Sequence, residues 1–447
     1  MSKEHSIVVG AGPVGSLLAI YLAKRGVQVD MYERRPDMRT TAIPAGRSIN
    51  LAMSDRGLRG LAGVGIDKDI LEISIPMHGR MIHHVDGRTE FQPYGNEGQC
   101  IYSVSRAEIN RRLMSLAEQH GATIHFNQRC EGVDLDRPSI TVRDEHKGTV
   151  HTHATDRIYG TDGAFSPVRG RMQTTDRFDY SQTYLDHGYK ELNIPAAPDG
   201  GFRMEKHALH IWPRGTYMLI ALPNLDGSFT CTLFFPHDGE RSFSSLDTPA
   251  KVSAFFKEVF PDAVELMPTL EHDFINNPTS SLCIVRCKPW HIADRALLIG
   301  DAAHAIVPFY GQGMNAGFED CTVFDRLADT LWHDREAMFR AFSNERKPNG
   351  DAIAELALRN FIEMRDLVAD PRFILRKKIE KAMHQHSPKN WVPLYSMVTF
   401  SHIPYSDALK EGQRQDAIME NILSWDGIEQ NWENLEVFGK IMALVSR

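Results

Sequence analysis

The sequence predicts an α/β fold in which a parallel α/β domain is interrupted by an antiparallel sheet and followed by a helical region. The chain opens with a short strand, a glycine-rich turn and a helix. Strand-like segments joined by turn residues occupy its middle, and helical patterning dominates from Ala337 onward. We therefore expect an α/β domain in two parts, 1–177 and 291–335, a β-sheet domain at 178–290, and a helical C-terminal region at 336–447.

Composition excludes several classes of protein. Hydrophobic residues make up 42% and charged residues 24% of the 447 residues, which is typical of globular chains and not of disordered or collagen-like ones. The net charge of −8 gives no global basic field, so no nucleic-acid partner is expected. Six cysteines are too few for a disulfide scaffold and suit a reducing compartment. No signal peptide and no apolar run of about 18 residues is present, so we expect a cytoplasmic protein without a membrane anchor.

The first elements form a β-α-β unit. Residues 6–9 are a β-branched run, residues 10–15 are a turn, and apolar residues recur at helical spacing over 17–22. Residues 24–26, Lys-Arg-Gly, supply a basic last turn and a stop, and 27–33 alternate like a strand.

Later elements follow the same signals. A helix is expected from Ser105 to His120, with Ser105 as its cap and Glu108 at the third position. Further strands are expected at 122–126, 140–142, 210–212, 217–222, 229–235 and 297–301.

The glycine turn carries the first chemical signal. Gly10, Gly12 and Gly15 have the spacing of a dinucleotide-binding turn, and Glu33 ends the next strand, where it can accept from ribose hydroxyls. The glycines let the backbone approach a pyrophosphate, and the helix N-terminus stabilises its charge. The turn alone does not separate FAD from NAD, and a tight turn that binds nothing is the alternative.

Two later motifs separate these cofactors. Residues 160–169, which contain Asp162, and residues 300–304, followed by Pro308, resemble the Asp-Gly and Gly-Asp motifs of the flavoprotein aromatic hydroxylases. The resemblance implies a Rossmann-like FAD-binding domain in which Asp301 contacts the ribityl chain and the following helix points at the flavin ring. For His304 we favour a structural role.

Longer segments narrow the resemblance to the kynurenine 3-monooxygenase family over nearly the whole chain. These segments are Gly46–Ala52, Gln92–Gly95, His187–Leu192, Leu209–Pro213, Val307–Asn315 and Tyr395–Phe400. Tyr310 stands where relatives have histidine or phenylalanine, so the resemblance does not define the details of the pocket beside the flavin ring. Eukaryotic relatives continue into a membrane-anchoring segment, whereas Glu433, Glu436 and Lys440 interrupt the apolar pattern here.

The resemblance implies FAD as the cofactor and NADPH as a co-substrate that docks transiently, because only one glycine fingerprint is present. The implied flavin contacts are Gly10, Gly12, Val14, Gly15, Glu33, Arg34, Arg35, Ala52, Arg106, Cys130, Asp162, Asp301, Pro308, Gly311, Gly313, Met314 and Asn315.

The resemblance also implies a site for an amino-acid substrate. Arg80 and Tyr94 match the groups that hold its carboxylate, and Asn360 and Tyr395 match other polar contacts. An arginine fork suits a carboxylate because it binds both oxygens. Glu363 lies three residues after Asn360, so it either receives the substrate ammonium or is a solvated helix charge.

The remaining pocket residues are apolar or aromatic. Met218, Ile220 and Leu222 alternate along one strand face and are either pocket wall or core. Phe234, Phe309 and Tyr310 complete the expected wall.

The implied reaction is hydroxylation of L-kynurenine to 3-hydroxykynurenine with NADPH and O₂, through oxygen added at C4a of the reduced flavin. The substrate is an aniline that already offers its nitrogen lone pair, so no indispensable general base and no certain catalytic residue is expected. The alternatives are a hydroxylase of another aromatic acid and a flavin-binding protein without hydroxylase activity. No metal site is expected, because Cys283 and Cys287 lack partners at zinc spacing.

Overall fold

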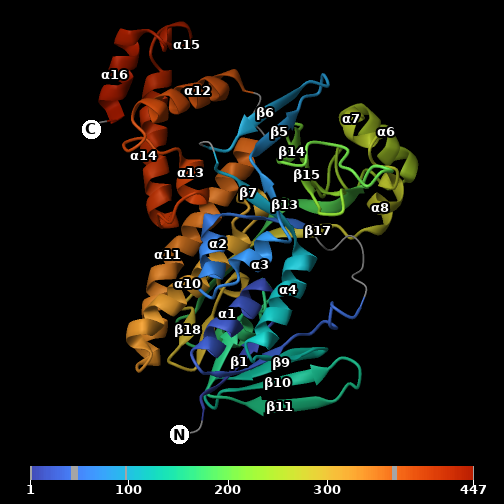
Figure 1. Ribbon diagram of the computed structural model, residues 1–447, viewed down its shortest axis with the longest axis vertical. Helices are drawn as coiled ribbons and strands as arrows, with labels where there is room; N and C mark the ends of the chain where they lie inside the picture. Colours follow the sequence, from blue (N-terminus) through green and yellow to red (C-terminus); the bar gives the residue numbers. More distant parts are fainter. Residues whose placement is uncertain (1–2, 42–48, 96–97, 365–369, 446–447) are drawn as a thin grey trace.

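The predicted α/β architecture is confirmed. The computed structural model describes residues 3–41, 49–95, 98–364 and 370–445. Figure 1 shows the N-terminal α/β part in the lower half of the molecule, with a second sheet above it and the C-terminal helices at the upper left. Strands from before and after the segment that forms the upper sheet join in one sheet of the α/β part.

The lower part is built on a mixed sheet whose strands come from both ends of the predicted split domain. Its order is β18 (His291–Ile292), β19 (Ala296–Leu298), β12 (Arg157–Gly160), β1 (His5–Val9), β2 (Gln28–Tyr32) and β8 (Thr123–His125). All neighbours are parallel except β18 and β19. Parallel strands place their carboxyl ends at one edge, where ligands of such sheets bind.

Helices cover this sheet, and several of them begin at that edge. They are α1 (Pro13–Lys24), α2 (Asp55–Ala62), α3 (Asp67–Leu71), α4 (Arg106–Gln119), α5 (Pro167–Met172), α9 (Asp301–His304) and α10 (Gly313–Leu331). Helix α1 packs against both α4 and α10. Ser105 occupies the position before α4, but its side chain makes no capping hydrogen bond, contrary to the prediction. Ser105 is the last residue of β7, where its backbone pairs with Asn50.

Two small sheets flank the α/β part. One is antiparallel and contains β9 (Gln128–Asp134), β10 (Ser139–Asp144) and β11 (Val150–Ala154). The other contains β3 (Asn50–Met53), β4 (Ile75–Met77) and β7 (Ile101–Ser105).

The upper sheet is larger than the sequence predicted. Its order is β17 (Ser280–Lys288), β13 (Asp179–Ile194), β16 (Phe229–Pro236), β15 (Met218–Pro223), β14 (Ala208–Pro213), β5 (Gly79–His83) and β6 (Thr89–Pro93). Strands β5 and β6 come from the chain segment assigned to the first domain, and β5 joins β14 in parallel. This addition brings Arg80 into the upper sheet.

One face of the upper sheet is covered by α6 (Pro249–Val259), α7 (Pro261–Val264) and α8 (Leu270–Asn276). The other face meets η1 (Pro308–Tyr310), α11 (Arg335–Ile362), α13 (Leu394–Thr399) and α14 (Tyr405–Leu423). The remaining C-terminal helices, α12 (Pro371–His386), α15 (Ile428–Asn431) and α16 (Leu435–Val445), pack with α14 in a separate cluster. Helix α11 is 28 residues long and runs from the α/β part to this second face.

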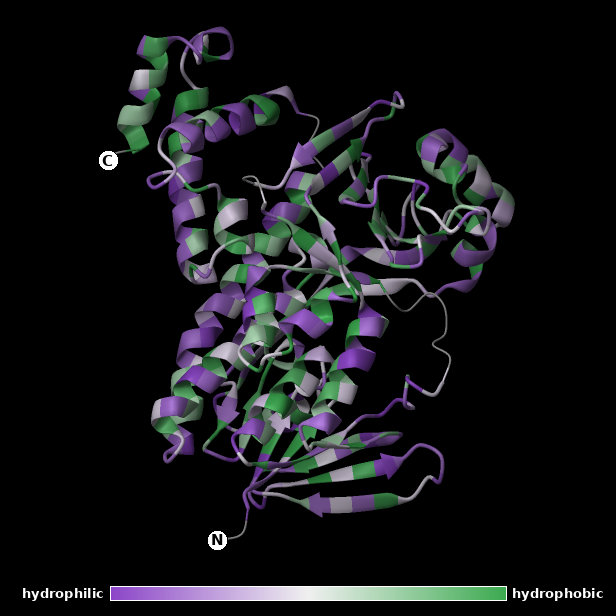
Figure 2. Ribbon diagram, viewed as in Figure 1, coloured by the Kyte–Doolittle hydropathy of each residue, from purple (hydrophilic) through white to green (hydrophobic). Residues whose placement is uncertain are grey.

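Burial follows this layering. Figure 2 shows hydrophilic and hydrophobic residues alternating along the C-terminal helices. Among the described helices, none combines the length and the apolar character needed to cross a bilayer. The described residues also contain no cluster of three or more side chains of the types that bind metals.

Candidate functional site

The glycine turn lies between the carboxyl ends of β1 and β12. Gly10 has a φ of +95°, and a Cβ there would lie 2.8 Å from the carbonyl oxygen of Thr161, so only glycine fits. A Cβ at Gly12 would meet nothing within 4 Å. The N-terminus of α1 therefore opens onto free space, as a pyrophosphate requires.

Glu33 is fixed directly above this turn. One carboxylate oxygen accepts from the Ala11 backbone at 3.0 Å and the other from the Arg35 backbone at 3.0 Å. Arg34 and the rest of Arg35 are exposed. The end of β2 and the glycine turn are thus held together, and the carboxylate keeps acceptor capacity for a ribose hydroxyl.

Asp162 is the clearest unfilled acceptor in this region. Its Oδ2 accepts from the Val168 backbone at 3.2 Å, while its Oδ1 is buried with no partner among the described residues. Burial raises the pKa of Asp162 to about 6. Arg169 donates to the carbonyls of Ala164 at 2.5 Å and Ala302 at 2.8 Å, which ties the two flavin motifs together.

Asp301 begins the short helix α9. Its side chain is accessible, yet burial by surrounding protein raises its pKa against the opposing effects of Arg106 and His304. An accessible group surrounded by protein lies in a recess rather than on a convex surface. His304 does not face this recess as a free base, since its Nε2 lies 2.6 Å from Asp320 Oδ2 in the core, in agreement with the predicted structural role.

The segment after η1 holds its shape through Asn315. Its Nδ2 donates to Ala52 and Gly311 carbonyls at 2.8 and 2.7 Å, and its Oδ1 accepts from the Ser54 backbone. Gly311 has a φ of +65°, and a Cβ there would lie 3.1 Å from that of Ala52. Pro308 begins η1, and Gly313 begins α10.

The other predicted flavin residues differ in exposure. Val14 packs against Gly300 and Gly317, so its side chain has a structural role and only its backbone faces the turn. Met314 packs at the edge of the α/β core, and Cys130 is buried there, with a pKa raised by burial to about 12. The thiol of Cys130 therefore stays neutral.

These features fit FAD. The open space at Gly12 suits a pyrophosphate, the unpaired oxygen of Asp162 suits a hydroxyl donor, and Asp301 adds an accessible carboxylate. The N-terminus of α10 lies beyond them in the same region and can stabilise negative charge on a reduced ring.

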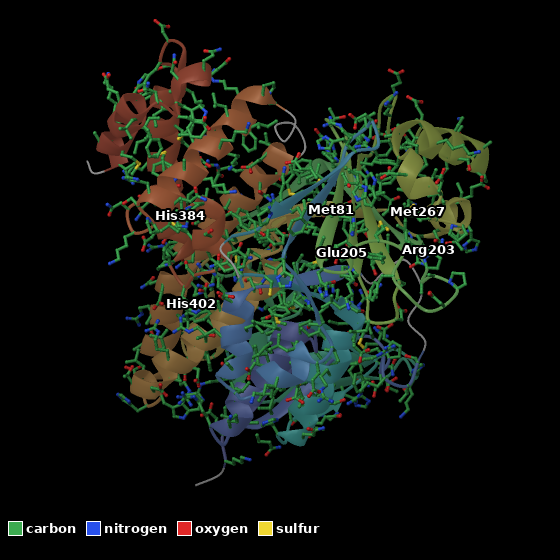
Figure 3. The ribbon with its side chains drawn as sticks, turned by 45° about the horizontal axis from the view of Figure 1, so that its top comes forward. Met81, Arg203, Glu205, Met267, His384 and His402 are labelled. Atoms are coloured by element: carbon green, nitrogen blue, oxygen red, sulfur yellow. The ribbon has the colours of Figure 1, made fainter. Side chains whose placement is uncertain are left out.

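Arg80 lies on the neighbouring sheet, on the strand β5 that Met81 marks in Figure 3. Its guanidinium carbon is 5.4 Å from the Tyr94 ring centre and 4.9 Å from that of Tyr395. Its Nε and the Tyr94 hydroxyl are buried without a hydrogen-bond partner among the described residues. No described carboxylate lies within 4.0 Å of the guanidinium. A largely enclosed cation without a carboxylate in direct contact is costly, so the geometry favours an anionic ligand.

Three tyrosines line up beside this cation. The Tyr94 and Tyr395 rings stack at 5.4 Å, and the Tyr310 and Tyr395 rings stack at 5.6 Å, with interplanar angles of 10° and 14°. Burial raises the pKa of Tyr310 well above its usual range, so its hydroxyl stays protonated. Tyr310 therefore joins the site as a neutral ring.

Asn360 and Glu363 lie at the end of α11. Asn360 donates to the Phe309 carbonyl at 2.6 Å, which binds α11 to η1. Glu363 is half-buried, lies 3.5 Å from Lys377, and is close enough to raise the pKa of Arg80. Both residues lie at the site, but the side-chain amide of Asn360 binds the backbone of Phe309.

The apolar wall spans two strands and η1. Met218 pairs directly with Phe234, whose ring is 4.8 Å from that of Phe309. Ile220 and Leu222 continue the same face of β15 and pack with Tyr94. Sequence reasoning missed Phe361, which stacks on Phe309 at 4.1 Å, because its position beside Asn360 carried no separate signal.

Comparison with known proteins agrees with this geometry. Residues 4–357 match the FAD binding domain family. The chain is 51% identical over 447 residues to kynurenine 3-monooxygenase of Flavobacterium psychrophilum, covering 100% of both chains. It is 51% identical to the Flavobacterium johnsoniae protein of that name, covering 98% of each.

The chain belongs to the kynurenine 3-monooxygenase family.

Solved structures support the fold. The tetrameric form of 2-methyl-3-hydroxypyridine-5-carboxylic acid oxygenase matches with a TM-score of 0.66 and 20% identity, over 83% of this chain and 95% of that one. Within the segments that resemble the kynurenine 3-monooxygenase family, residues 46–48 lie outside the described part of the chain. The other segments lie in or next to β3, β6, β13, β14, η1 with the start of α10, and α13.

Proposed function

We propose that this protein is an FAD-dependent monooxygenase that hydroxylates L-kynurenine to 3-hydroxykynurenine with NADPH and O₂. The observation that carries the proposal is Arg80, which lies between two tyrosines with a buried Nε that has no partner among the described residues. It stands beside an apolar wall, and the carboxylate of Asp301 lies in the part of the molecule that fits FAD. Family membership supplies the substrate and the co-substrate.

FAD is held by the glycine turn, Glu33, Asp162, Asp301 and the N-terminus of α10. Bound FAD supplies the oxygen chemistry after NADPH has reduced it. The protein contributes binding, orientation and the exclusion of water, so every other step rests on residues of the chain.

Arg80 receives the kynurenine carboxylate through its fork of donors, and the Tyr94 hydroxyl donates to the same group. Glu363 receives the α-ammonium, which replaces Lys377 as the cation beside this carboxylate. With both charges of the amino acid fixed at one end, the aryl ring extends along Met218, Ile220 and Phe309. This wall excludes water from the reacting carbon.

The chain needs no general base for this reaction. The amine of an aniline directs oxygen to the neighbouring carbon with its own lone pair, so positioning is the principal contribution of the site. The tyrosines fit this role, since burial raises the pKa of Tyr310 and Tyr395 and keeps both hydroxyls protonated.

We also propose a cytoplasmic location. All six cysteines are free in the structure, which suits a reducing compartment.

The test is the reaction itself. Purified holoprotein is mixed with NADPH, O₂ and kynurenine, and the product is measured by mass spectrometry alongside a panel of other aromatic acids. A product 16 mass units heavier, about one oxygen atom, is expected from kynurenine in preference to the panel. Flavin reduction without any hydroxylated product would contradict the proposal.

A further inference from the structure

Arg56, on α2, makes contacts that no ordinary ion pair explains. Its side chain is completely buried. Its Nη1 bonds to Glu319 at 2.5 Å, while Nε donates to the Val398 carbonyl at 2.9 Å. Its Nη2 donates to the carbonyls of Met397, at 3.2 Å, and Ile403. All three guanidinium nitrogens are therefore used, and three of the acceptors are backbone carbonyls of a distant segment.

Those carbonyls belong to the end of α13 and to the loop that follows it. A helix C-terminus leaves its last carbonyls unpaired and carries partial negative charge, so a buried cation there fixes both the position and the direction of the helix. The guanidinium also lies 4.1 Å from the ring centre of Tyr405, the first residue of α14. Figure 3 places His402, in the loop between α13 and α14, where the C-terminal helices adjoin the blue N-terminal part.

Helix α13 carries Tyr395, the tyrosine in the middle of the stack. Tyr395 lies against Tyr94 and Tyr310 and is the aromatic ring nearer to the Arg80 cation. A rotation or shift of α13 moves Tyr395, and with it the surface on which Arg80 rests. Arg56 thus acts on the carboxylate site through α13 without touching a ligand.

Arg56 is also joined to the flavin motif. Glu319 bonds to Arg346 at 2.7 Å, and Arg346 bonds to Asp320 at 2.6 Å. Asp320 in turn accepts from the Gly300 backbone at 2.9 Å, next to Asp301. Burial opposes ionisation of Glu319, but Arg346 and Arg56 hold its pKa below its usual range, so the chain of charges is complete at neutral pH.

We propose that Arg56 is a positioning residue that links α13 to the flavin motif, so that the bound substrate is held in register with the flavin ring. The proposal rests on the proposed function. It predicts that loss of the link weakens kynurenine binding and lowers the fraction of NADPH oxidation that ends in hydroxylation. FAD content and the KM for NADPH should stay the same.

The test compares three variants. Arg56→Lys keeps the charge but offers one nitrogen where three are used, and Glu319→Gln keeps the shape of the partner but removes its charge. Arg59→Met, on the exposed side of the same helix, is the matched control. For each, FAD content, KM for kynurenine, KM for NADPH and 3-hydroxykynurenine formed per NADPH are measured.

For Arg56→Lys we expect normal FAD content, a KM for kynurenine raised about tenfold, a KM for NADPH within about twofold of wild type, and a product yield per NADPH lowered by about half or more. Glu319→Gln should change the same quantities less, and Arg59→Met should change none. If Arg56→Lys fails to fold, the same criteria are applied to Glu319→Gln.

Two results overturn the inference. The first is an unchanged kynurenine KM and an unchanged product yield in a folded variant. The second is a lower FAD content together with a rise in the KM for kynurenine and in the KM for NADPH, which signals general loosening of the structure. If wild type makes no hydroxylated product, the proposed function fails separately. In that case the inference is decided by the Kd of kynurenine, from flavin absorbance, in wild type and Arg56→Lys.

Discussion

Replacement of Arg80 by methionine tests the carboxylate site directly. Methionine keeps most of the length and the apolar stem, and only the fork of donors is lost. Arg80 forms no direct ion pair with a described carboxylate, and its interactions in the chain are with the neutral tyrosines and, at longer range, with Glu363, which keeps Lys377 as its partner. The effect should therefore fall on the ligand and not on folding.

The magnitude follows from the contacts that a carboxylate makes here. A charge-assisted hydrogen bond contributes about 1.5–3 kcal/mol, and a two-bond fork is partly replaced by water in the variant, so a loss of about 2–4 kcal/mol is expected. That corresponds to a fall in kcat/KM of about 30- to 1,000-fold. Most of it should appear in KM, since the carboxylate is remote from the reacting carbon and is bound equally before and during oxygen transfer.

The assay is steady-state 3-hydroxykynurenine formation at saturating NADPH, together with the FAD content of the purified variant. Arg88→Met is the matched control, because Arg88 lies at the tip of the same β5–β6 hairpin with a side chain that is 75% exposed. The control should behave as wild type. A near-normal KM for kynurenine in Arg80→Met, or loss of its flavin, would refute the role given to Arg80.

Three further predictions test the flavin site and its support. Gly12→Leu should give folded but colourless protein, because its side chain enters the open space at the N-terminus of α1; a fully yellow variant would contradict this. In flavin-free protein, the pKa of Asp162 at about 6 lies above its unfolded value, so its ionisation costs stability as pH rises through 6. Asp162→Asn should therefore raise the free energy of unfolding at pH 8 by on the order of 1–3 kcal/mol, measured as a higher thermal midpoint, and lose this advantage towards pH 4, whereas an equal gain at both pH values would exclude Asp162 as the cause. Asp320→Ala leaves Arg346 buried without that partner and should cost about 3–5 kcal/mol in urea unfolding, against about 1 kcal/mol or less for the more exposed Asp325→Ala; equal costs would count against the buried network.

The sequence was informative wherever a local pattern determines a local shape. The glycine turn, β1, α1 and β2 follow from hydrophobic periodicity and from the steric demand at Gly10, which the structure shows as a close approach to Thr161. The alternation along β15 likewise predicted that Met218, Ile220 and Leu222 share one face, and these residues pack away from the core under α6 and α8; their role as a pocket wall stays a prediction.

The missing information concerned long-range pairing. Nothing in residues 79–93 indicates that they leave the first domain and join β14, because strand patterns do not specify the partner strand. The same limit hid Arg56, whose backbone acceptors are 341 to 347 residues away along the chain. The side chain of Asn360 matched a substrate contact by position, but its bond to Phe309 depends on the meeting of α11 and η1.

Strand β15 divides its side chains between two separate cores. Met218 and Ile220 face the proposed pocket, whereas Leu219 and Ala221 pack under α6 and α8. Under the proposed function, substrate preference and fold stability are encoded at alternating positions of this one strand. Even-numbered substitutions can reshape the ring-binding wall while the odd-numbered scaffold stays intact, so a library confined to even positions should retain a much larger folded fraction than one spread over the whole strand.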